Sequence, residues 1–284
     1  MLDSCFAACY AENGVTIMFF NAKNGLAYTS GGPVDYIAFG RGSKNLVILP
    51  GLGDGLKTVK GMALTMALMY RILADDFRVY MFSRGRNLPE NADIEYMAAE
   101  LKEAMDSLGI KRASVLGVSM GGAIAQHLAA EYPDMVEKLV LAVSYAAVND
   151  TVRESITSWI EKAQRDDFAA IFADTAERSY TAKKLKLYRP LYPMLGRFTT
   201  PKDPGRFIAM AKACLEHDAR AQLSKIKAPT LVVGGDCDKV VGGEAAAELA
   251  SLIDCAELCV YKGYSHGLYE EAPDFNKRVF EFIK

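Results

Sequence analysis

The chain has 284 residues, of which 51% are hydrophobic and 24% charged, and its net charge is −2. This length allows one or two domains with a large buried core. The near-neutral charge argues against a nucleic-acid-binding protein, which usually carries a clear basic excess. Because there are only 3 histidines, a His-rich metal centre is nearly excluded, and we expect neither a metal nor a cofactor.

The beginning of the chain does not predict a targeting segment. Asp3 comes early and no Lys or Arg precedes Lys23, whereas a secretory signal starts with basic residues. The longest apolar stretches are about ten residues, too short to cross a membrane. We therefore expect a cytoplasmic protein with no membrane or nucleic-acid partner. Residues 1–24 do not fit the pattern that follows and are interpreted as an N-terminal extension.

Apolar runs rich in β-branched and aromatic residues alternate with helical patterns along most of the chain. The first two predicted strands are separated only by the short turn 40–43, which favours an antiparallel hairpin. Later strands are separated by helices, which indicates a mainly parallel sheet covered on both faces. The predicted strands are 34–39, 46–49, 77–82, 113–118, 136–143, 230–233 and 257–261, and the helices are 59–73, 94–108, 122–131, 244–252 and 273–283.

This alternation stops between about 147 and 219, where only helical patterns and several prolines occur. We interpret 147–219 as a helical cap inserted into an α/β core made of 25–146 and 220–284. The cap carries aromatic residues that could line an apolar pocket or form the cap's own core. They are Trp159, Phe168, Phe172, Tyr180, Tyr188, Tyr192 and Phe207.

A G-x-S-x-G motif with Ser119 at its centre carries the clearest chemical signal. A predicted strand precedes the motif and a predicted helix follows it, which is the context of a nucleophile elbow. Gly117 and Gly121 have no side chains, and side chains at these positions would clash at such a sharp turn. A phosphate-binding loop would show a GxGxxG or GK[ST] pattern, and neither is present here. Ser119 is therefore the predicted nucleophile.

A serine nucleophile needs a base, and in this topology the base follows a carboxylate that itself follows the serine. Only His217 and His266 lie after Ser119. His266 lies in a glycine-flanked loop after a predicted strand, where α/β sheets place their sites. At the junction of cap and core we expect a polar surface role for His217, and His127 should pack or face solvent.

The acid that orients the histidine should follow the strand 230–233, where Asp236 and Asp238 compete. Asp238 lies further past the strand end, so we favour it, and we expect Asp236 to form a turn. Backbone amides should stabilise the oxyanion. Met120 follows the nucleophile, and Leu52 lies in a loop with glycines at 51, 53 and 55.

These motifs together resemble the α/β-hydrolase superfamily, in particular its small-capped serine hydrolases. The resemblance covers about 30–284 and rests on LPGLGD (49–54), GVSMGG (117–122), APTLVVGGDCD (228–238) and GYSHGLYEEAPDFNKRVFEF (263–282). It implies an eight-stranded, mostly parallel sheet, a cap after the sixth strand, and Asp238 as the acid. The chain departs from the family pattern at Pro50-Gly51, at 83–86 and at Gly242-Gly243.

The sequence therefore predicts a serine hydrolase that cleaves a small carboxylic ester, with Ser119, His266 and Asp238 as the triad. C–C bond, thioester or amide hydrolysis and acyl transfer use a similar set of residues and stay open. A non-catalytic small-molecule receptor is the alternative from another class. The 6 cysteines show no C-x-x-C spacing and are expected to be ordinary thiols. The sequence does not predict an oligomeric state.

Overall fold

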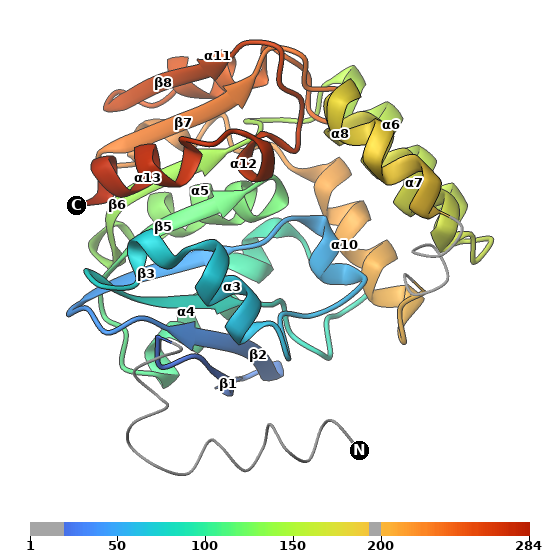
Figure 1. Cartoon of the computed structure of the whole chain (residues 1–284). Helices are drawn as coiled ribbons and strands as arrows, with labels where there is room; N and C mark the ends of the chain where they lie inside the picture. Colours follow the sequence, from blue (N-terminus) through green and yellow to red (C-terminus); the bar gives the residue numbers. More distant parts are fainter. Residues whose placement is uncertain (1–19, 193–199) are drawn as a thin grey trace.

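A computed structural model of the protein describes residues 20–192 and 200–284 (Figure 1). Its centre is a sheet of 8 strands in the order β1-β2-β4-β3-β5-β6-β7-β8. β2 is antiparallel to its neighbours β1 and β4, and all other neighbouring strands are parallel, which confirms the predicted fold class. The strands are β1 (Lys23–Thr29), β2 (Gly32–Phe39), β3 (Lys44–Leu49), β4 (Phe77–Phe82), β5 (Ala113–Val118), β6 (Val136–Ala142), β7 (Thr230–Gly235) and β8 (Ala256–Tyr261).

The predicted hairpin between 34–39 and 46–49 is wrong. β2 and β3 follow each other in the chain, but β4 lies between them in the sheet. The turn that joins them is bound to the chain leading into β4, since the N–H of Arg41 donates to the carbonyl of Ala74 at 2.8 Å. Gly40 has a φ of 89°, a region that favours glycine. This turn therefore carries the chain past β4 rather than back onto β2.

The antiparallel hairpin is formed by β1 and β2, which pair from Lys23 opposite Ala38 to Thr29 opposite Gly32. Strand β1 begins inside the segment 1–24 that the sequence suggested as an extension. Residues 1–19 of that segment, with Cys5 and Cys9, lie outside the described part of the chain. The other cysteines, at 214, 237, 255 and 259, are free thiols.

Helices cover both faces of the sheet (Figure 1). One face carries α4 (Ile94–Ser107), α5 (Met120–Glu131) and α11 (Ala245–Ser251), and the other carries α3 (Ala63–Met69), α12 (Leu268–Glu271) and α13 (Phe275–Ile283). β3 shows how the strands supply both cores: Val47 and Leu49 belong to one buried cluster, and Leu46 and Ile48 to the other. This alternation follows from the two-residue period of a strand. Short 3₁₀ turns lie between these elements: η2 (Leu52–Gly55), η3 (Arg71–Leu73), η4 (Pro133–Met135) and η7 (Leu223–Lys225).

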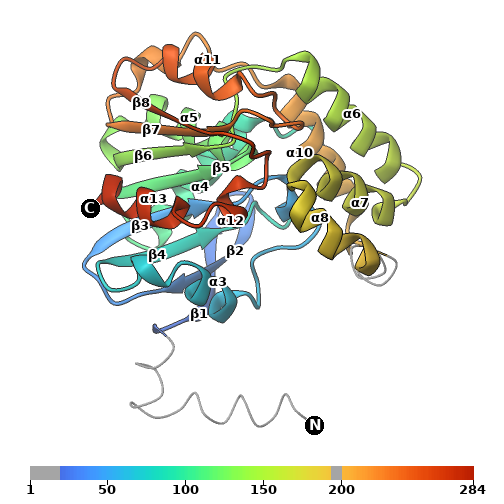
Figure 2. The same ribbon diagram turned by 45° about the horizontal axis from the view of Figure 1, so that its top comes forward.

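The chain between β6 and β7 forms a group of helices at one side of the sheet, which we call the cap (Figure 2). The carboxylate or amide oxygens of Asn149, Asp167 and Asp203 accept hydrogen bonds from the N–H groups three residues later, so each caps a helix. The cap contains α6 (Asp150–Ala163), α7 (Phe168–Ser179), α8 (Ala182–Tyr188), η5 (Arg189–Leu191) and α10 (Pro204–Glu216). An isolated bridge between Ala147 and Asp218 joins the two ends of this segment.

None of the helices in 20–192 and 200–284 is both long enough and apolar enough to cross a lipid bilayer.

Candidate active site

Ser119 lies at the sharp turn between β5 and α5. Its backbone has φ 55° and ψ −121°, a strained conformation that non-glycine residues rarely adopt. The turn fits because its neighbours are glycines: a methyl group at Gly117 would overlap the backbone of the Gly121–Gly122 segment, and one at Gly122 would come within 2.6 Å of Ser144. The strand–turn–helix context predicted for the G-x-S-x-G motif is thus present, and it presents the Ser119 hydroxyl at the carboxyl end of β5.

The structure brings His266 to this hydroxyl from the loop after β8. His266 Nε2 lies 2.9 Å from Ser119 Oγ, and His266 Nδ1 lies 2.9 Å from Asp238 Oδ2. A carboxylate can only accept, so Nδ1 carries the proton and Nε2 is left to accept from the Ser119 hydroxyl. Both His266 and Asp238 are buried. The three residues therefore form one hydrogen-bonded chain suited to proton transfer.

Asp238, rather than Asp236, occupies the position next to the histidine. Its second oxygen, Oδ1, accepts hydrogen bonds from the backbone N–H groups of Val240 (2.8 Å) and Val241 (3.0 Å). These bonds fix the carboxylate in one orientation. Asp236 is exposed and lies in the turn that the N–H of Asp238 closes on the carbonyl of Gly235 at 3.2 Å, as predicted. Its carboxylate accepts from the N–H of Gly263 at 2.7 Å, in the loop after β8.

The loop after β3 packs against the serine turn. A Cβ atom at Gly51 would lie 3.1 Å from Ser119 Cβ, and one at Gly121 would overlap the carbonyl oxygen of Leu49. Leu52 directly follows Gly51 and begins η2, while Met120 begins α5. The first N–H groups of a helix have no acceptor within it. The structure therefore brings both predicted oxyanion residues to the immediate surroundings of Ser119.

The cap holds the loop that carries His266. The Ser265 hydroxyl donates to the carbonyl of Arg178 at 2.5 Å, and the Gly267 N–H donates to the carbonyl of Ser179 at 2.8 Å. The Tyr180 hydroxyl lies 2.8 Å from Glu270, and the pKa of Tyr180 is raised by its burial and by the neighbouring carboxylate. The residues on both sides of His266 are thus tied to the end of α7.

The cap also holds the loop that carries Asp238. The Asn149 side chain donates to the carbonyl of Val241 at 2.7 Å, and the Ser155 hydroxyl donates to the carbonyl of Lys239 at 3.2 Å. The Ser265 hydroxyl accepts from the N–H of Lys239 at 3.2 Å, which links the two loops directly. Sequence reasoning gave none of these cap residues a role, because polar residues on helix surfaces carry no signal of where they bond.

Several of the aromatic residues of the cap are packed in the interior of the protein rather than lining an open pocket. Trp159, Phe168 and Phe207 are buried, and the rings of Phe168 and Phe207 pack edge to face at 6.3 Å between centroids. Tyr180 differs, since its ring lies against the backbone of Gly267, the residue after His266. Of the two roles left open, core packing applies to the three buried rings.

The surface role expected for His217 is wrong. Its imidazole is 4% exposed and packs between Tyr145 and His127, with ring centroids at 5.3 Å and 5.4 Å. His217 follows the last turn of α10, where the cap returns to the core and closes over α5, so the side chain is enclosed. Burial and the neighbouring His127 lower its pKa to about 4.

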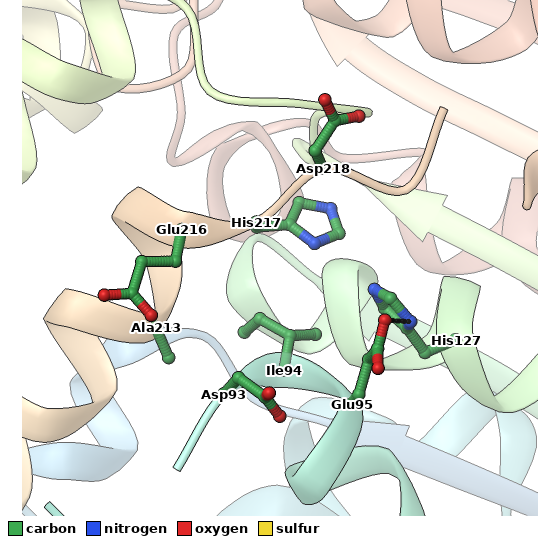
Figure 3. A pocket seen from close by; sticks show the side chains of 8 residues that line it. All are labelled: Asp93, Ile94, Glu95, His127, Ala213, Glu216, His217 and Asp218. Carbon is green, nitrogen blue, oxygen red and sulfur yellow. Dashed lines mark ion pairs between the residues drawn. The ribbon is translucent and has the colours of Figure 1, made fainter. Parts of the chain in front are cut away.

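His217 and His127 line a pocket that is drawn in Figure 3. None of the residues that line this pocket belongs to the serine turn. The pocket has a volume of about 240 Å³. Its other lining residues are mostly acidic and come from the start of α4 and the end of α10: Asp93, Ile94, Glu95, Ala213, Glu216 and Asp218. Burial also lowers the pKa of His127, which Glu95 partly opposes from 3.8 Å. In the described part of the chain, no group of three or more His, Cys, Asp or Glu side chains could hold a metal ion.

A sequence model of the alpha/beta hydrolase fold matches residues 44–273, which is most of the chain. The protein belongs to the α/β-hydrolase family. The match spans the serine turn, the cap and the loops of Asp238 and His266. This membership confirms the resemblance seen in the sequence. It assigns the protein to a fold that many hydrolases share.

Curated relatives of this α/β-hydrolase carry several activities. AB hydrolase superfamily protein YisY of Bacillus subtilis is 29% identical over 223 residues, 75% of this chain and 81% of that protein. A 2-hydroxy-6-oxo-6-phenylhexa-2,4-dienoate hydrolase of Comamonas testosteroni is 28% identical over 202 residues, 66% of this chain and 68% of that protein. The chain matches only 12% of the length of polyketide synthase ThaQ of Burkholderia thailandensis, at 27% identity over 271 residues that are 91% of this chain.

Solved structures share the fold of this α/β-hydrolase. The enol-lactonase of Burkholderia xenovorans LB400 superposes with a TM-score of 0.77 at 24% identity, covering 91% of this chain and 99% of that one. An esterase of Exiguobacterium antarcticum superposes with a TM-score of 0.77 at 21% identity, covering 92% and 99%. At these identities the likeness concerns the fold.

Proposed function

We propose that this α/β-hydrolase cleaves a small carboxylic ester through an acyl-enzyme on Ser119. The observation that carries the proposal is the chain of two 2.9 Å hydrogen bonds from Ser119 through His266 to Asp238. A free hydroxyl is a weak nucleophile at neutral pH, and this chain supplies both the base and the group that orients it. Membership of a hydrolase family supports the same reading.

In the first half of the reaction, Ser119 Oγ attacks the ester carbonyl carbon while its proton passes to His266 Nε2. The Asp238 carboxylate holds the Nδ1–H and stabilises the imidazolium that forms. The C–O bond to the alcohol then breaks, and His266 Nε2–H gives its proton to the leaving oxygen. The products of this half are the free alcohol and the acyl group bound to Ser119.

In the second half, water replaces the alcohol. His266 Nε2 takes a proton from the water as its oxygen attacks the acyl carbon. The bond from that carbon to Ser119 Oγ breaks, and Oγ recovers the proton from His266. The sum of both halves converts one ester and one water into an acid and an alcohol, with the enzyme unchanged.

Negative charge develops on the carbonyl oxygen in both halves, and the amides of Leu52 and Met120 are the proposed donors. Met120 begins a helix of 12 residues, whose N-terminal end favours an anion. The loop of Leu52 packs on the serine turn through Gly51. Donors fixed in advance need no rearrangement when the charge appears, which is the source of their effect on rate.

The same residues could act on other bonds. Hydrolysis of a C–C bond in a diketone, of a thioester or of an amide, and acyl transfer to an alcohol, all need the nucleophile, base and oxyanion donors described above. A non-catalytic receptor would bind a small molecule without cleaving it. These alternatives differ in what happens after a substrate meets Ser119, so kinetics separate them.

Pre-steady-state kinetics with p-nitrophenyl esters of increasing acyl length test the proposal. We expect a burst of p-nitrophenol close to one equivalent of enzyme, followed by slower turnover, because p-nitrophenolate leaves readily and the attack of water on the acyl-enzyme then limits the rate. Ser119→Ala should lose both phases. Ser251→Ala, on the exposed side of α11, is the matched control and should keep them.

A panel with a thioester, an enol-lactone, a carbamate and a diketone distinguishes the bond types. Turnover of a carboxylic ester at least tenfold above the others supports the proposed substrate class. Preference for the enol-lactone would narrow the substrate class to a cyclic ester, whereas preference for the thioester, the carbamate or the diketone would replace the ester by that bond. Absence of turnover and of a burst in folded wild-type protein would favour the receptor.

A further inference from the structure

A buried arginine of the cap reaches the loop that carries Leu52. Arg206 lies in the first turn of α10, and its side chain is 7% exposed. Its Nη2 atom donates to Asp54 Oδ2 at 2.7 Å, and its Nη1 atom donates to the backbone carbonyl of Asp54. Asp54 is in η2, two residues after Leu52, and its side chain is fully buried.

The same guanidinium binds the loop after β4. Nη2 also donates to the carbonyl of Arg84 at 2.9 Å, and Nε donates to the carbonyl of Gly85 at 3.1 Å. In return, the N–H of Arg84 donates to Asp54 Oδ2 at 2.9 Å. Arg206 thus joins three segments that are distant in the sequence: the cap helix α10, the turn η2 and the loop after β4.

Close packing reinforces this connection. A Cβ atom at Gly55, the last residue of η2, would lie 3.0 Å from Cα of Phe207 on α10, so the two backbones meet without a side chain between them. The other oxygen of the Asp54 carboxylate, Oδ1, has no hydrogen-bond partner among the described residues. Without Arg206, the buried carboxylate would therefore keep only the Arg84 amide.

We propose that Arg206 and Asp54 are positioning residues that fix the Leu52 amide in the oxyanion hole from the cap side. The inference rests on the proposed function, because it gives the Leu52 amide its role. A planar guanidinium is suited to this task, since it fixes several acceptors at once, whereas an ammonium acts as a point charge. The position of helix α10 thereby sets the geometry of the oxyanion donor.

The experiment compares single variants with a double variant. Arg206→Met leaves a buried carboxylate unpaired and is expected to lower stability, which alone would not distinguish a structural role from a positioning one. Arg206→Met combined with Asp54→Leu removes both charges, and apolar replacement of a buried pair is often neutral or stabilising. The double variant also leaves the backbone carbonyls of Asp54, Arg84 and Gly85 without the guanidinium, so it should melt above Arg206→Met and below wild type.

In the folded double variant we expect kcat to fall on the order of 10- to 100-fold. Moving an oxyanion donor out of place lowers kcat somewhat less than deleting the donor does. KM should change by less than about threefold. Arg206→Lys should keep a higher kcat than Arg206→Met, because it retains the positive charge. Arg189→Met is the matched control, because Arg189 forms an exposed two-point pair with Glu177 in the same cap, and its kcat should equal that of wild type.

A second measurement does not depend on activity. Amide hydrogen exchange of a peptide covering 50–56 should be faster in the double variant and unchanged in Arg189→Met. A stable double variant with wild-type kcat and wild-type exchange would overturn the inference. If the wild-type protein has no serine hydrolase activity, the proposed function fails, and faster exchange alone would still show that the pair fixes the loop.

Discussion

Gly121 lies so close to Leu49 that a side chain at position 121 would overlap the Leu49 carbonyl oxygen. The contact joins the serine turn at the end of β5 to the loop that leaves β3. Ser119 and the Leu52 amide are therefore held by two neighbouring parallel strands, and the distance between them depends on the absence of a side chain at this contact.

Gly121→Ala should separate these two loops. The added methyl group meets backbone atoms, which cannot move aside as the end of a side chain could, so we expect kcat to fall at least about 100-fold, together with a loss of stability on the order of 1–3 kcal/mol. Ester turnover and urea unfolding measure the two effects. Wild-type turnover in Gly121→Ala would show that the contact does not govern the site.

Asp238→Asn and Asp236→Asn form a matched pair of substitutions two residues apart. Asp238→Asn should lower kcat about 10³- to 10⁴-fold, because the carboxylate no longer holds the His266 tautomer or stabilises the imidazolium. Asp236→Asn keeps an oxygen for the N–H of Gly263 and should change kcat by less than about threefold. Steady-state ester hydrolysis compares them, and the opposite order of effects would assign the acid to Asp236.

Ser265→Ala should weaken the link between the cap and the two catalytic loops. The Ser265 hydroxyl bonds to the carbonyl of Arg178 and to the N–H of Lys239, so its loss frees both sides of the His266–Asp238 pair. We expect kcat to fall about three- to tenfold and the free energy of unfolding to fall by about 1 kcal/mol. Ser251→Ala, which loses a hydrogen bond within the exposed end of α11, is the control and should keep wild-type kcat. Equal effects in both variants would argue against a specific link.

The lowered pKa of His217 predicts that the protein loses stability in acid. This pKa is about 4 in the folded protein, against 6.5 for an unperturbed histidine. Between these values the unfolded chain binds a proton that the folded protein does not, so the stability present above pH 6.5 is lost as the pH falls toward 4. The full difference corresponds to roughly 3 kcal/mol, and His127, whose pKa is also lowered, acts in the same direction.

Urea unfolding at several pH values between 7.5 and 4 measures this effect. His217→Phe replaces the imidazole by an apolar ring and should make the free energy of unfolding less dependent on pH over this range. The same pH dependence in wild type and His217→Phe would show that His217 does not contribute.

Most of the fold could be predicted because buried strands and amphipathic helices have clear apolar periods. β1 was not predicted, since only Ala27 of its residues is buried and the strand lacks an apolar pattern. The position of β4 between β2 and β3 also escaped prediction. Neighbouring strands in the chain usually pair, whereas here β4 pairs with both β2 and β3, and the 40–43 turn packs against the start of β4.

The central residues of the site could be predicted because each lies at a strand end in a glycine-rich loop. The structure brings together Ser119, His266 and Asp238 as the sequence suggested. Arg206 could not be found in this way, because a single arginine on an amphipathic helix gives no sign that it is buried. The burial of His217 depends on how the cap closes over α5, which a local pattern does not contain.

The most direct test of the central claim is labelling of the folded protein with a fluorophosphonate, followed by peptide mass spectrometry. The account predicts one covalent adduct, located on Ser119, whose formation is slowed by at least about 100-fold in His266→Ala because the hydroxyl loses its base. Failure of folded wild-type protein to react, or an adduct on another residue with Ser119 unmodified, would contradict the assignment of Ser119 as a nucleophile activated by His266.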